Sequence, residues 1–362
     1  VDFLYRKGFD VRVLYIQEEK TTLVNSIHRK ITSKSLSFNE LKHEPLTLSG
    51  ILHLKERASQ KTILKELTNA YLKGYKKITS NHWTPDIIHA LSTEKAGFIA
   101  HKLSNKLGIP FYITEHNPII FSNKKRLDRK AFESATKTAV VSNHLLRHVL
   151  LQIDVAQPTV IWNLVNENNF SIEPKNDKSV FKIVTISYPQ MIKDMDTFFK
   201  AMAHLSKICF DKIEVIVVGN DHFNNVNEVP SADEIKAIAQ NYNTAEICTF
   251  IPFIERDNLS ALLNNTDVFI STSISETFGI ALREAMMCGV PVISTKNGGA
   301  EDIITSENGV LVNLKDYKSI AENIVKIKNK EIVFDPEKIR QSVVVQSGTD
   351  AFYHKMKSFY ES

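Results

Sequence analysis

The chain has 362 residues, of which 43% are apolar and 24% are charged, a composition typical of a folded globular protein of about two domains. No run of about 18 apolar residues occurs and no secretory signal is visible, which argues against a membrane-spanning or exported protein. The three cysteines, Cys209, Cys248 and Cys288, lie in apolar surroundings without metal-ligand spacing. We therefore expect buried thiols in a reducing compartment, that is, a cytoplasmic protein.

The net charge of +4 is divided unevenly along the chain. Residues 1–167 carry 25 Lys and Arg against 15 Asp and Glu, whereas residues 168–362 carry 20 against 26. A basic first half favours an anionic partner, such as a membrane surface, a lipid phosphate or an acidic glycan. A solvated basic surface without any partner explains the charge equally well, and we expect no nucleic acid among the partners.

Strand and helix patterns alternate along the first half of the chain. The residues before Gly8 resemble the end of a helix, so we expect that a first strand and loop are missing from the sequence as given. Strands are predicted at Val11–Ile16, Asp86–His89, Pro110–Thr114, Thr138–Ser142 and Thr159–Asn163, and helices at Leu54–Lys77, at Ala96–Leu107 and up to Thr136. This alternation predicts a parallel, doubly wound sheet. The polar stretch Asn168–Ser179 is interpreted as a linker.

The same pattern restarts at Phe181–Ile186. Further strands are predicted at Ile213–Val218, Glu246–Ile251, Val268–Ile270, Val292–Ile293 and Gly309–Val312, and helices at Thr197–Ile208, Ala232–Tyr242, Leu259–Asn264 and Asp350–Tyr360. We therefore predict an α/β protein with two Rossmann-like domains that face a cleft. The predicted domains are residues 1–170 and 171–349, followed by a final helix at 350–362.

The most informative stretch begins after the predicted strand Val268–Ile270. A polar loop leads to Gly279, which opens a helix, and Gly289 is placed to end that helix as its left-handed terminal residue. The next strand, Val292–Ile293, ends at a pair of glycines, after which a second helix is predicted from Ala300. In a parallel sheet such strand–loop–helix turns line the crevice at the carboxyl ends of the strands.

The residue types in these turns favour a ligand with phosphates and hydroxyls. Helix N-termini offer unpaired N–H groups, and Gly279 and Gly298-Gly299 leave room for a phosphate at the backbone. The carboxylates of Glu276 and Glu284 accept hydrogen bonds from hydroxyl groups. Together they describe a nucleotide-sugar site, although Glu284 alone could be a solvated helix residue and the two glycines merely a tight turn.

One string of residues closely resembles the donor-site motif of retaining glycosyltransferases of family 4, which have the GT-B fold. It consists of Glu276, Phe278-Gly279, Glu284, Cys288–Pro291 and Gly298–Glu301. Shorter resemblances lie at Pro85–Ala90, Pro110–His116 and Asn163–Asn166. The resemblance covers nearly the whole chain and is better in the second half.

The resemblance implies a site for a nucleoside diphosphate-sugar. Lys193 matches the lysine that neutralises the diphosphate, while Tyr188 stands where the family usually has an arginine, which puts the strength of that stabilisation in question. Arg283 is not expected to replace it. The implied donor-binding residues are Lys193, Pro252, Phe253, Glu276, Phe278, Gly279, Ile280, Ala281 and Glu284.

The implied catalytic residues are His116, Lys193 and Glu276. His116 and, as a weaker candidate, His89 are also implied on the acceptor side, although a single histidine is more often structural. No metal-ligand cluster is seen and no cofactor is expected, so Lys193 and the helix N-terminus would take the place of a cation.

The implied reaction moves a sugar from a nucleoside diphosphate to an acceptor hydroxyl with retention of configuration, in cell-envelope polysaccharide or glycolipid synthesis. The acceptor would be a glycan or a lipid-linked molecule, with peripheral contact to an anionic membrane through the basic half. Two alternatives remain open: a nucleotide-sugar epimerase and a non-catalytic partner subunit. A dinucleotide-dependent oxidoreductase lacks its Gly-x-Gly-x-x-Gly string here. Because the family's first loop borders donor and acceptor, we expect weak activity without it.

Overall fold

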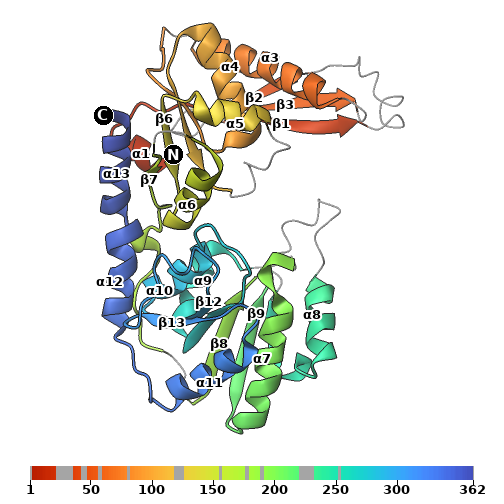
Figure 1. Ribbon diagram of the computed structural model, residues 1–362, viewed down its shortest axis with the longest axis vertical. Coiled ribbons are helices and arrows are strands. Elements are labelled where there is room, and N and C mark those ends of the chain that lie inside the picture. Colours follow the sequence, from red (N-terminus) through yellow and green to blue (C-terminus); the bar gives the residue numbers. More distant parts are fainter. Residues whose placement is uncertain are drawn as a thin grey trace. The chain divides into compact units, whose positions relative to one another are not determined.

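The computed structural model describes residues 2–21, 36–41, 47–55, 59–79, 82–117, 126–154, 157–175, 179–187, 191–219, 232–251 and 254–361 (Figure 1). Contacts between Cα atoms divide the chain into two compact units. The first unit comprises Val1–Ala139 and Val149–Thr159, and the second comprises Val140–His148 and Val160–Ser362. The domain limits predicted from the sequence stay a prediction.

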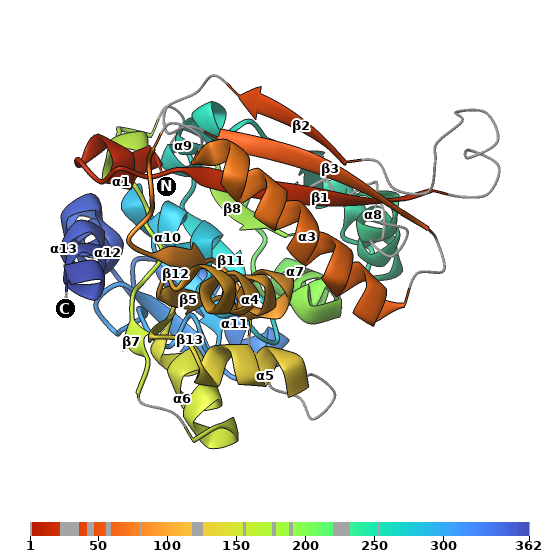
Figure 2. The same ribbon diagram turned by 90° about the horizontal axis from the view of Figure 1, so that it is seen from above.

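The first unit holds two sheets, with strand orders β1-β3-β2 and β4-β5-β6-β7. Its elements are α1 (Asp2–Arg6), β1 (Val13–Thr21), β2 (Leu36–Leu41), β3 (Thr47–Lys55), α3 (Gln60–Ile78), β4 (Ile88–Ala90), α4 (Phe98–Leu107), β5 (Phe111–Glu115), α5 (Arg126–Glu133), β6 (Lys137–Val140) and β7 (Thr159–Val160). Helix α6 (Asn143–Gln152) is divided between the two units. Helix α3 lies across β1 and β3 (Figure 2). Ile16 and Leu52 of this sheet pack with Leu67 of α3 and Leu103 of α4 in a buried apolar cluster.

Two predictions for the first unit are wrong. The helix predicted at Leu54–Lys77 begins only at Gln60, since the side chain of Ser59 accepts a hydrogen bond from Thr62 N at 3.2 Å and caps it. Strand β2 runs antiparallel to β3, although only parallel strands were predicted. Five residues join β2 to β3, which suffices for a hairpin, whereas a parallel crossover needs about a dozen.

The second unit is one six-stranded sheet of order β10-β9-β8-β11-β12-β13, and each neighbouring pair is parallel, as predicted. Its elements are β8 (Phe181–Ile186), α7 (Met195–Ile208), β9 (Ile213–Val218), α8 (Ala232–Asn241), β10 (Cys248–Ile251), α9 (Arg256–Asn264), β11 (Val268–Ser271), α10 (Ile280–Met287), β12 (Val292–Thr295), β13 (Gly309–Val312), α11 (Tyr317–Lys328), α12 (Pro336–Ser347) and α13 (Thr349–Glu361).

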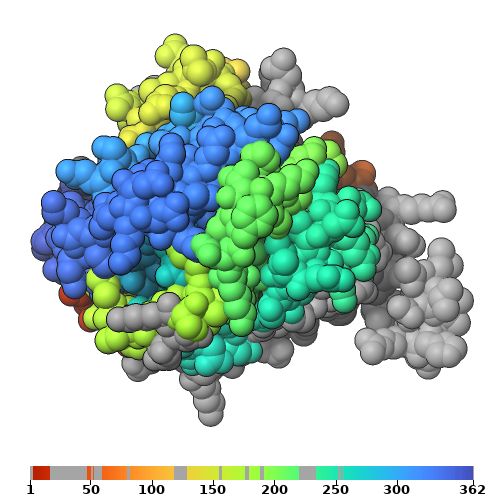
Figure 3. Space-filling model, turned by 90° about the horizontal axis from the view of Figure 1, so that it is seen from below, coloured from red at the N-terminus to blue at the C-terminus, as the bar shows by residue number. Residues whose placement is uncertain are grey.

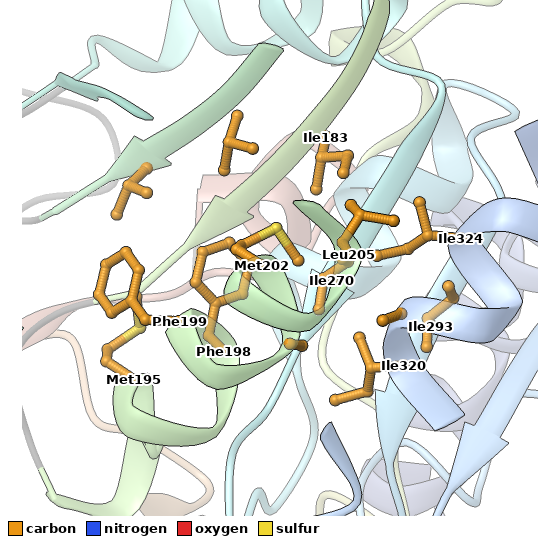
Figure 4. Packing of buried hydrophobic residues seen from close by; sticks show 14 of the residues in the cluster. Ile183, Met195, Phe198, Phe199, Met202, Leu205, Ile270, Ile293, Ile320 and Ile324 are labelled. Atoms are coloured by element: carbon orange, nitrogen blue, oxygen red, sulfur yellow. The ribbon is translucent and has the colours of Figure 1, made fainter. Parts of the chain in front are cut away.

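Helices α7 and α11 cover the same part of this sheet. Apolar residues recur along α7 at helical spacing, so one side of the helix is continuously buried. Figure 4 shows Phe198 and Met202 of α7 beside Ile183 and Ile270 of the sheet, with Ile320 of α11 completing the cluster. The outer surfaces of α11 (blue) and α7 (green) lie next to each other in Figure 3. Helices α7 and α11 thus share one apolar cluster with the sheet.

The helix predicted from Ala300 is absent, and the structure has turns in its place. Ile304 N donates to Ala300 O at 2.9 Å, which makes a single helical turn. The side chain of Asn308 then ends it, because Oδ1 accepts from Thr305 N at 2.8 Å and Nδ2 donates to Ile303 O at 3.0 Å. A continuing helix would need those same backbone groups.

The C-terminal helix was predicted at Asp350–Tyr360 and is confirmed as α13. The carboxylate of Glu167 accepts a hydrogen bond from Thr349 N at 2.8 Å and so caps the start of this helix within the second unit. The family resemblance also implies that this helix returns to the first domain, and that stays a prediction. No helix among the described residues is long and apolar enough to cross a bilayer.

Candidate functional site

The chain reverses its direction across the second sheet between β8 and β11. From β8 it proceeds through β9 to β10 on one side, and it then returns to β11 and proceeds through β12 to β13 on the other. Ligands of open parallel sheets bind at such a switch point, outside the carboxyl ends of the strands. The segments that leave β8 and β11 here carry Lys193 and Glu276.

The segment after β8 is held against the loop after β11. It ends in a short 3₁₀ turn at Met191–Lys193, and Asp194 then caps α7, because its carboxylate accepts from Thr197 N at 3.3 Å and from the Thr197 hydroxyl at 2.7 Å. Ile274 N donates to Ile192 O at 2.7 Å, and the Thr272 hydroxyl donates to Lys193 O at 3.1 Å. The backbone at Ile192 and Lys193 is therefore held against the loop after β11.

Lys193 and Glu276 form an ion pair between Nζ and Oε1. Their side chains are only 14% and 21% exposed, and the Ser273 hydroxyl donates to the same carboxylate oxygen at 3.0 Å. The sequence predicted these two residues, 83 positions apart, at one site, and the structure places them in contact. A cation and an anion held together at a strand switch point can meet a phosphate and a hydroxyl of one ligand.

The N-terminus of α10 opens beside this pair. Gly279 caps the helix with φ of 78°, a left-handed conformation that favours glycine, and it offers no side chain to the first helical N–H groups. Phe278 is buried, Ile280 is 47% exposed and Ala281 is half-buried. The helix therefore begins at Gly279, as predicted, with its first amides available to an anion.

The loop after β12 packs directly on the loop after β11. Glu276 N donates to Asn297 O at 2.9 Å, and Gly299 N donates to Glu276 O at 2.8 Å. A Cβ on Gly299 would lie 2.9 Å from Phe278 N, closer than such atoms approach. Gly299 is therefore required for backbone contact between the loops, which gives the glycine pair a structural role whether or not a phosphate also uses it.

Glu284 lies inside α10 and is 6% exposed. The preceding residue, Arg283, is fully buried and was not predicted to contribute to the site. Burial lowers the pKa of its guanidinium to about 9, which leaves the group charged at neutral pH. Its burial is not visible in any local pattern of the sequence, because two of its contacts, Gly299 and Gln346, lie 16 and 63 positions further along the chain.

The remaining donor-side predictions lie outside the described residues. Pro252 and Phe253, predicted near the base, are among them, and so is Tyr188. The part of the chain that is described holds no group of three or more His, Cys, Asp or Glu side chains placed to bind a metal ion. A cavity of about 420 Å³ opens beside α7, but its lining includes neither Lys193 nor Glu276, so it belongs to another part of the unit.

The first unit brings His89 and His116 together. His89 lies within β4 and His116 directly follows the paired strand β5, and His89 Nε2 is 2.8 Å from the Thr114 hydroxyl. Burial, and then the nearby His116, lowers the pKa of His89 to about 4, while burial alone lowers the pKa of His116. Both rings are therefore neutral near pH 7 and can donate and accept hydrogen bonds.

Glu115, the last residue of β5, was not predicted from the sequence as a site residue. Its side chain is 0% exposed, and it accepts hydrogen bonds from His116 N and Asn117 N, both at 2.7 Å, and from Thr93 N at 2.8 Å. Burial raises the pKa of Glu115, although these hydrogen bonds oppose the shift. The carboxylate shapes the loop that carries His116, and its place just before that histidine is the one signal that could have identified it.

The low pKa of His89 makes the stability of the protein depend on pH. The unfolded chain binds a proton at this ring near pH 6.5 and the folded chain only near pH 4, so acidification from pH 7 to 5 favours unfolding. We expect this half-buried ring to remove about 1–2 kcal/mol of unfolding free energy over that range. In urea unfolding, His89→Gln should lose less unfolding free energy between pH 7 and pH 5 than the wild type does. The variant His354→Gln, changed at an exposed site, should lose as much as the wild type. Equal losses in all three proteins would refute this assignment.

Comparisons with known proteins bear on the family and the fold of this chain. The family model "Glycosyl transferases group 1" matches residues 166–342. N-acetyl-alpha-D-glucosaminyl L-malate synthase of Bacillus anthracis is 26% identical over 248 residues, which cover 60% of this chain and 62% of that relative. The matched part thus spans about three fifths of the length of this relative.

Two solved structures share the fold. Sucrose-phosphate synthase from Thermosynechococcus elongatus superposes with a TM-score of 0.77 at 18% identity and covers 99% of this chain and 90% of its own. Anabaena HepE in complex with UDP-glucose gives a TM-score of 0.70 at 17% identity and covers 97% and 100%. Both are GT-B proteins, as the sequence predicted for this chain. The chain therefore has the GT-B fold of glycosyltransferases, and its residues 166–342 match glycosyl transferases group 1.

Proposed function

We propose that this protein is a retaining glycosyltransferase of family 4 that moves a sugar from a nucleoside diphosphate to an acceptor hydroxyl. The observation that carries the proposal is the pairing of Lys193 with Glu276 at the switch point of the second sheet, beside the N-terminus of α10. The family match over residues 166–342 supports the same reaction class.

The leaving group of such a reaction is a diphosphate, on which negative charge grows as the bond to the sugar breaks. Lys193 and the backbone amides of Phe278, Gly279, Ile280 and Ala281 would stabilise that charge. An incoming diphosphate would compete with Glu276 for the ammonium group and release the carboxylate toward the sugar hydroxyls. We expect no metal ion to be needed, because these groups supply the positive potential.

The donor is proposed to be a UDP-sugar. The complex of the GT-B protein HepE contains UDP-glucose, and the name of the Bacillus relative specifies an N-acetylglucosaminyl group. Glu284 would hold the ribose hydroxyls, Glu276 would contact the sugar, and Pro252 and Phe253 would lie near the base.

Retention is proposed to follow a front-face substitution. The acceptor oxygen bonds to the anomeric carbon while the bond from that carbon to the diphosphate oxygen breaks on the same face, and the acceptor proton passes to the departing phosphate. His116 would orient the acceptor or the sugar as a neutral hydrogen-bonding group, and His89 would support it on the acceptor side.

The acceptor is proposed to be a glycan or a lipid-linked molecule used in the cell envelope. The excess of positive charge in residues 1–167 would attract such an anionic acceptor, or the membrane surface that carries it, to a cytoplasmic enzyme. Stronger sedimentation with vesicles of anionic than of neutral lipid, abolished by salt, is the expected sign of that contact.

Incubation with UDP-glucose or UDP-N-acetylglucosamine and a panel of sugar and lipid-linked acceptors tests the function. We expect a new glycoside whose anomeric configuration equals that of the donor, as read by proton NMR. Epimerised or hydrolysed sugar without any acceptor product would favour the epimerase alternative. A melting temperature that no nucleoside diphosphate raises would favour a non-catalytic subunit and overturn the proposal.

A further inference from the structure

Arg283 lies buried behind the proposed diphosphate site. It belongs to α10, directly before Glu284, and is 0% exposed. Its guanidinium carbon lies 3.9 Å from the centre of the Phe278 ring and 5.9 Å from that of Trp162. A buried cation is costly unless all its N–H groups find acceptors, so the acceptors it contacts indicate what it holds in place.

The guanidinium joins both loops of the site to α12. Nη1 donates to Phe278 O in the loop after β11, and Nη1 and Nη2 each lie 3.5 Å from Gly299 O in the loop after β12. Nε and Nη2 donate to Gln346 Oε1 at 3.2 and 3.1 Å. Gln346 in turn donates to Asp302 O at 2.9 Å. Only the planar fork of arginine supplies donors in these several directions from one group.

The contact with Phe278 O fixes the direction of the next amide. In a trans peptide the carbonyl and the N–H point to opposite sides. Because Phe278 O points to the buried guanidinium, the N–H of Gly279 points away from it, at the N-terminal end of α10. The first amide proposed to meet the diphosphate is therefore oriented from behind by Arg283.

The positive charge of Arg283 also acts on the proposed diphosphate site. Glu276 is one of the carboxylates whose negative charge stabilises the charged guanidinium. A diphosphate that replaced Glu276 beside Lys193 would experience the same attraction, since a buried charge is poorly screened.

We propose that Arg283 is a positioning residue for the donor diphosphate: it orients the Gly279 amide, locks the two loops together through Phe278 O and Gly299 O, and adds buried positive charge beneath the phosphates. This inference rests on the proposed function. A diphosphate carries more negative charge and more acceptor oxygens than a monophosphate, so the loss of Arg283 should weaken UDP more than UMP, which a general loss of stability would not do.

Arg340 provides a matched control. This arginine of α12 donates through Nη1 to Met287 O, at the other end of α10, and to Phe170 O at 2.7 Å, and through Nη2 to Glu167 O at 2.9 Å. Both arginines thus contact three backbone or amide oxygens, but of the two Arg283 is the one that reaches the N-terminal end of α10. Lysine at either position keeps the positive charge but lacks the planar guanidinium with its several N–H donors.

The experiment measures the dissociation constants of UDP and UMP by calorimetry in folded wild type, Arg283→Lys, Arg283→Met and Arg340→Lys. We expect Arg283→Lys to weaken UDP about 10-fold and UMP less than about 2-fold, and Arg283→Met to weaken UDP further. Arg340→Lys should lower the melting temperature but leave the ratio of the two constants unchanged. Should the Arg283 variants fail to fold, Gln346→Met is measured in their place. We expect it to raise the ratio of the UDP to the UMP dissociation constant, by less than the Arg283 variants would.

An unchanged ratio in the folded Arg283 variants, or in Gln346→Met where those variants do not fold, would overturn the assignment of Arg283 while leaving the proposed function intact. Failure of wild type to bind UDP or any other nucleoside diphosphate would instead overturn the proposed function, and this inference with it. A change in the ratio that Arg340→Lys reproduces would mean that loosening either end of α10 has the same effect, which also contradicts a specific role for Arg283.

Discussion

Replacement of Lys193 by methionine is expected to lower kcat/KM for sugar transfer about 100- to 1,000-fold, the usual loss when one preorganised group that stabilises transition-state charge is removed. Methionine keeps the aliphatic length of the side chain but removes the ammonium that pairs with Glu276. The loss should appear mainly in kcat, because charge on the diphosphate increases as the bond to the sugar breaks. Initial rates over a range of donor concentrations separate kcat from KM.

A suitable control for this variant is Lys326→Met, which removes a lysine from the exposed side of α11. It should transfer sugar at the wild-type rate. If Lys193→Met is folded and reaches more than about a tenth of wild-type kcat, Lys193 does not stabilise the leaving group.

Glu284→Gln is expected to raise the dissociation constant of the donor about 10- to 100-fold, the value of a hydrogen bond to a charged acceptor. Glutamine has nearly the same shape but replaces one acceptor oxygen by a donor, which faces the ribose hydroxyls unfavourably. Because the ribose is remote from the breaking bond, kcat at saturating donor should change less than the affinity. Calorimetry with UDP measures the effect directly.

The control for Glu284 is Glu322→Gln, which alters an exposed carboxylate on α11. It should bind UDP as wild type does. A folded Glu284→Gln variant whose affinity for UDP equals that of the wild type would remove Glu284 from the proposed site. Equal losses of affinity for a uracil ligand with the ribose and for one without it would do the same.

The second unit could be predicted largely from local signals in the sequence. The short apolar stretch at Val268–Ile270 and the glycines at 279 and 289 mark a strand, a helix start and a helix end, and each lies within one residue of its predicted place. The turn at Ala300 was mistaken for a helix because the side chain of Asn308, eight residues later, takes the backbone groups that a helix needs. Such competition is invisible to periodicity.

The first unit was predicted less well, because its β2–β3 hairpin has no short turn motif that marks it. Within the candidate site, Lys193 and Glu276 were identified through family resemblance, and their contact follows from the strand order, which places β8 beside β11. Arg283 and Glu115 were missed for a common reason: both are buried ionisable side chains, and some of their hydrogen-bond partners are distant in the sequence. Their partners are set by packing, which composition and spacing do not report.

The central claim is that a sugar diphosphate binds against the N-terminal end of α10 with Lys193 beside it. A crystal structure of the protein with UDP tests it most directly. The account predicts the diphosphate oxygens at hydrogen-bonding distance, about 3 Å, from Lys193 Nζ and from the amides that begin at Gly279. UDP bound elsewhere on the second unit, with Lys193 still paired to Glu276, would contradict it.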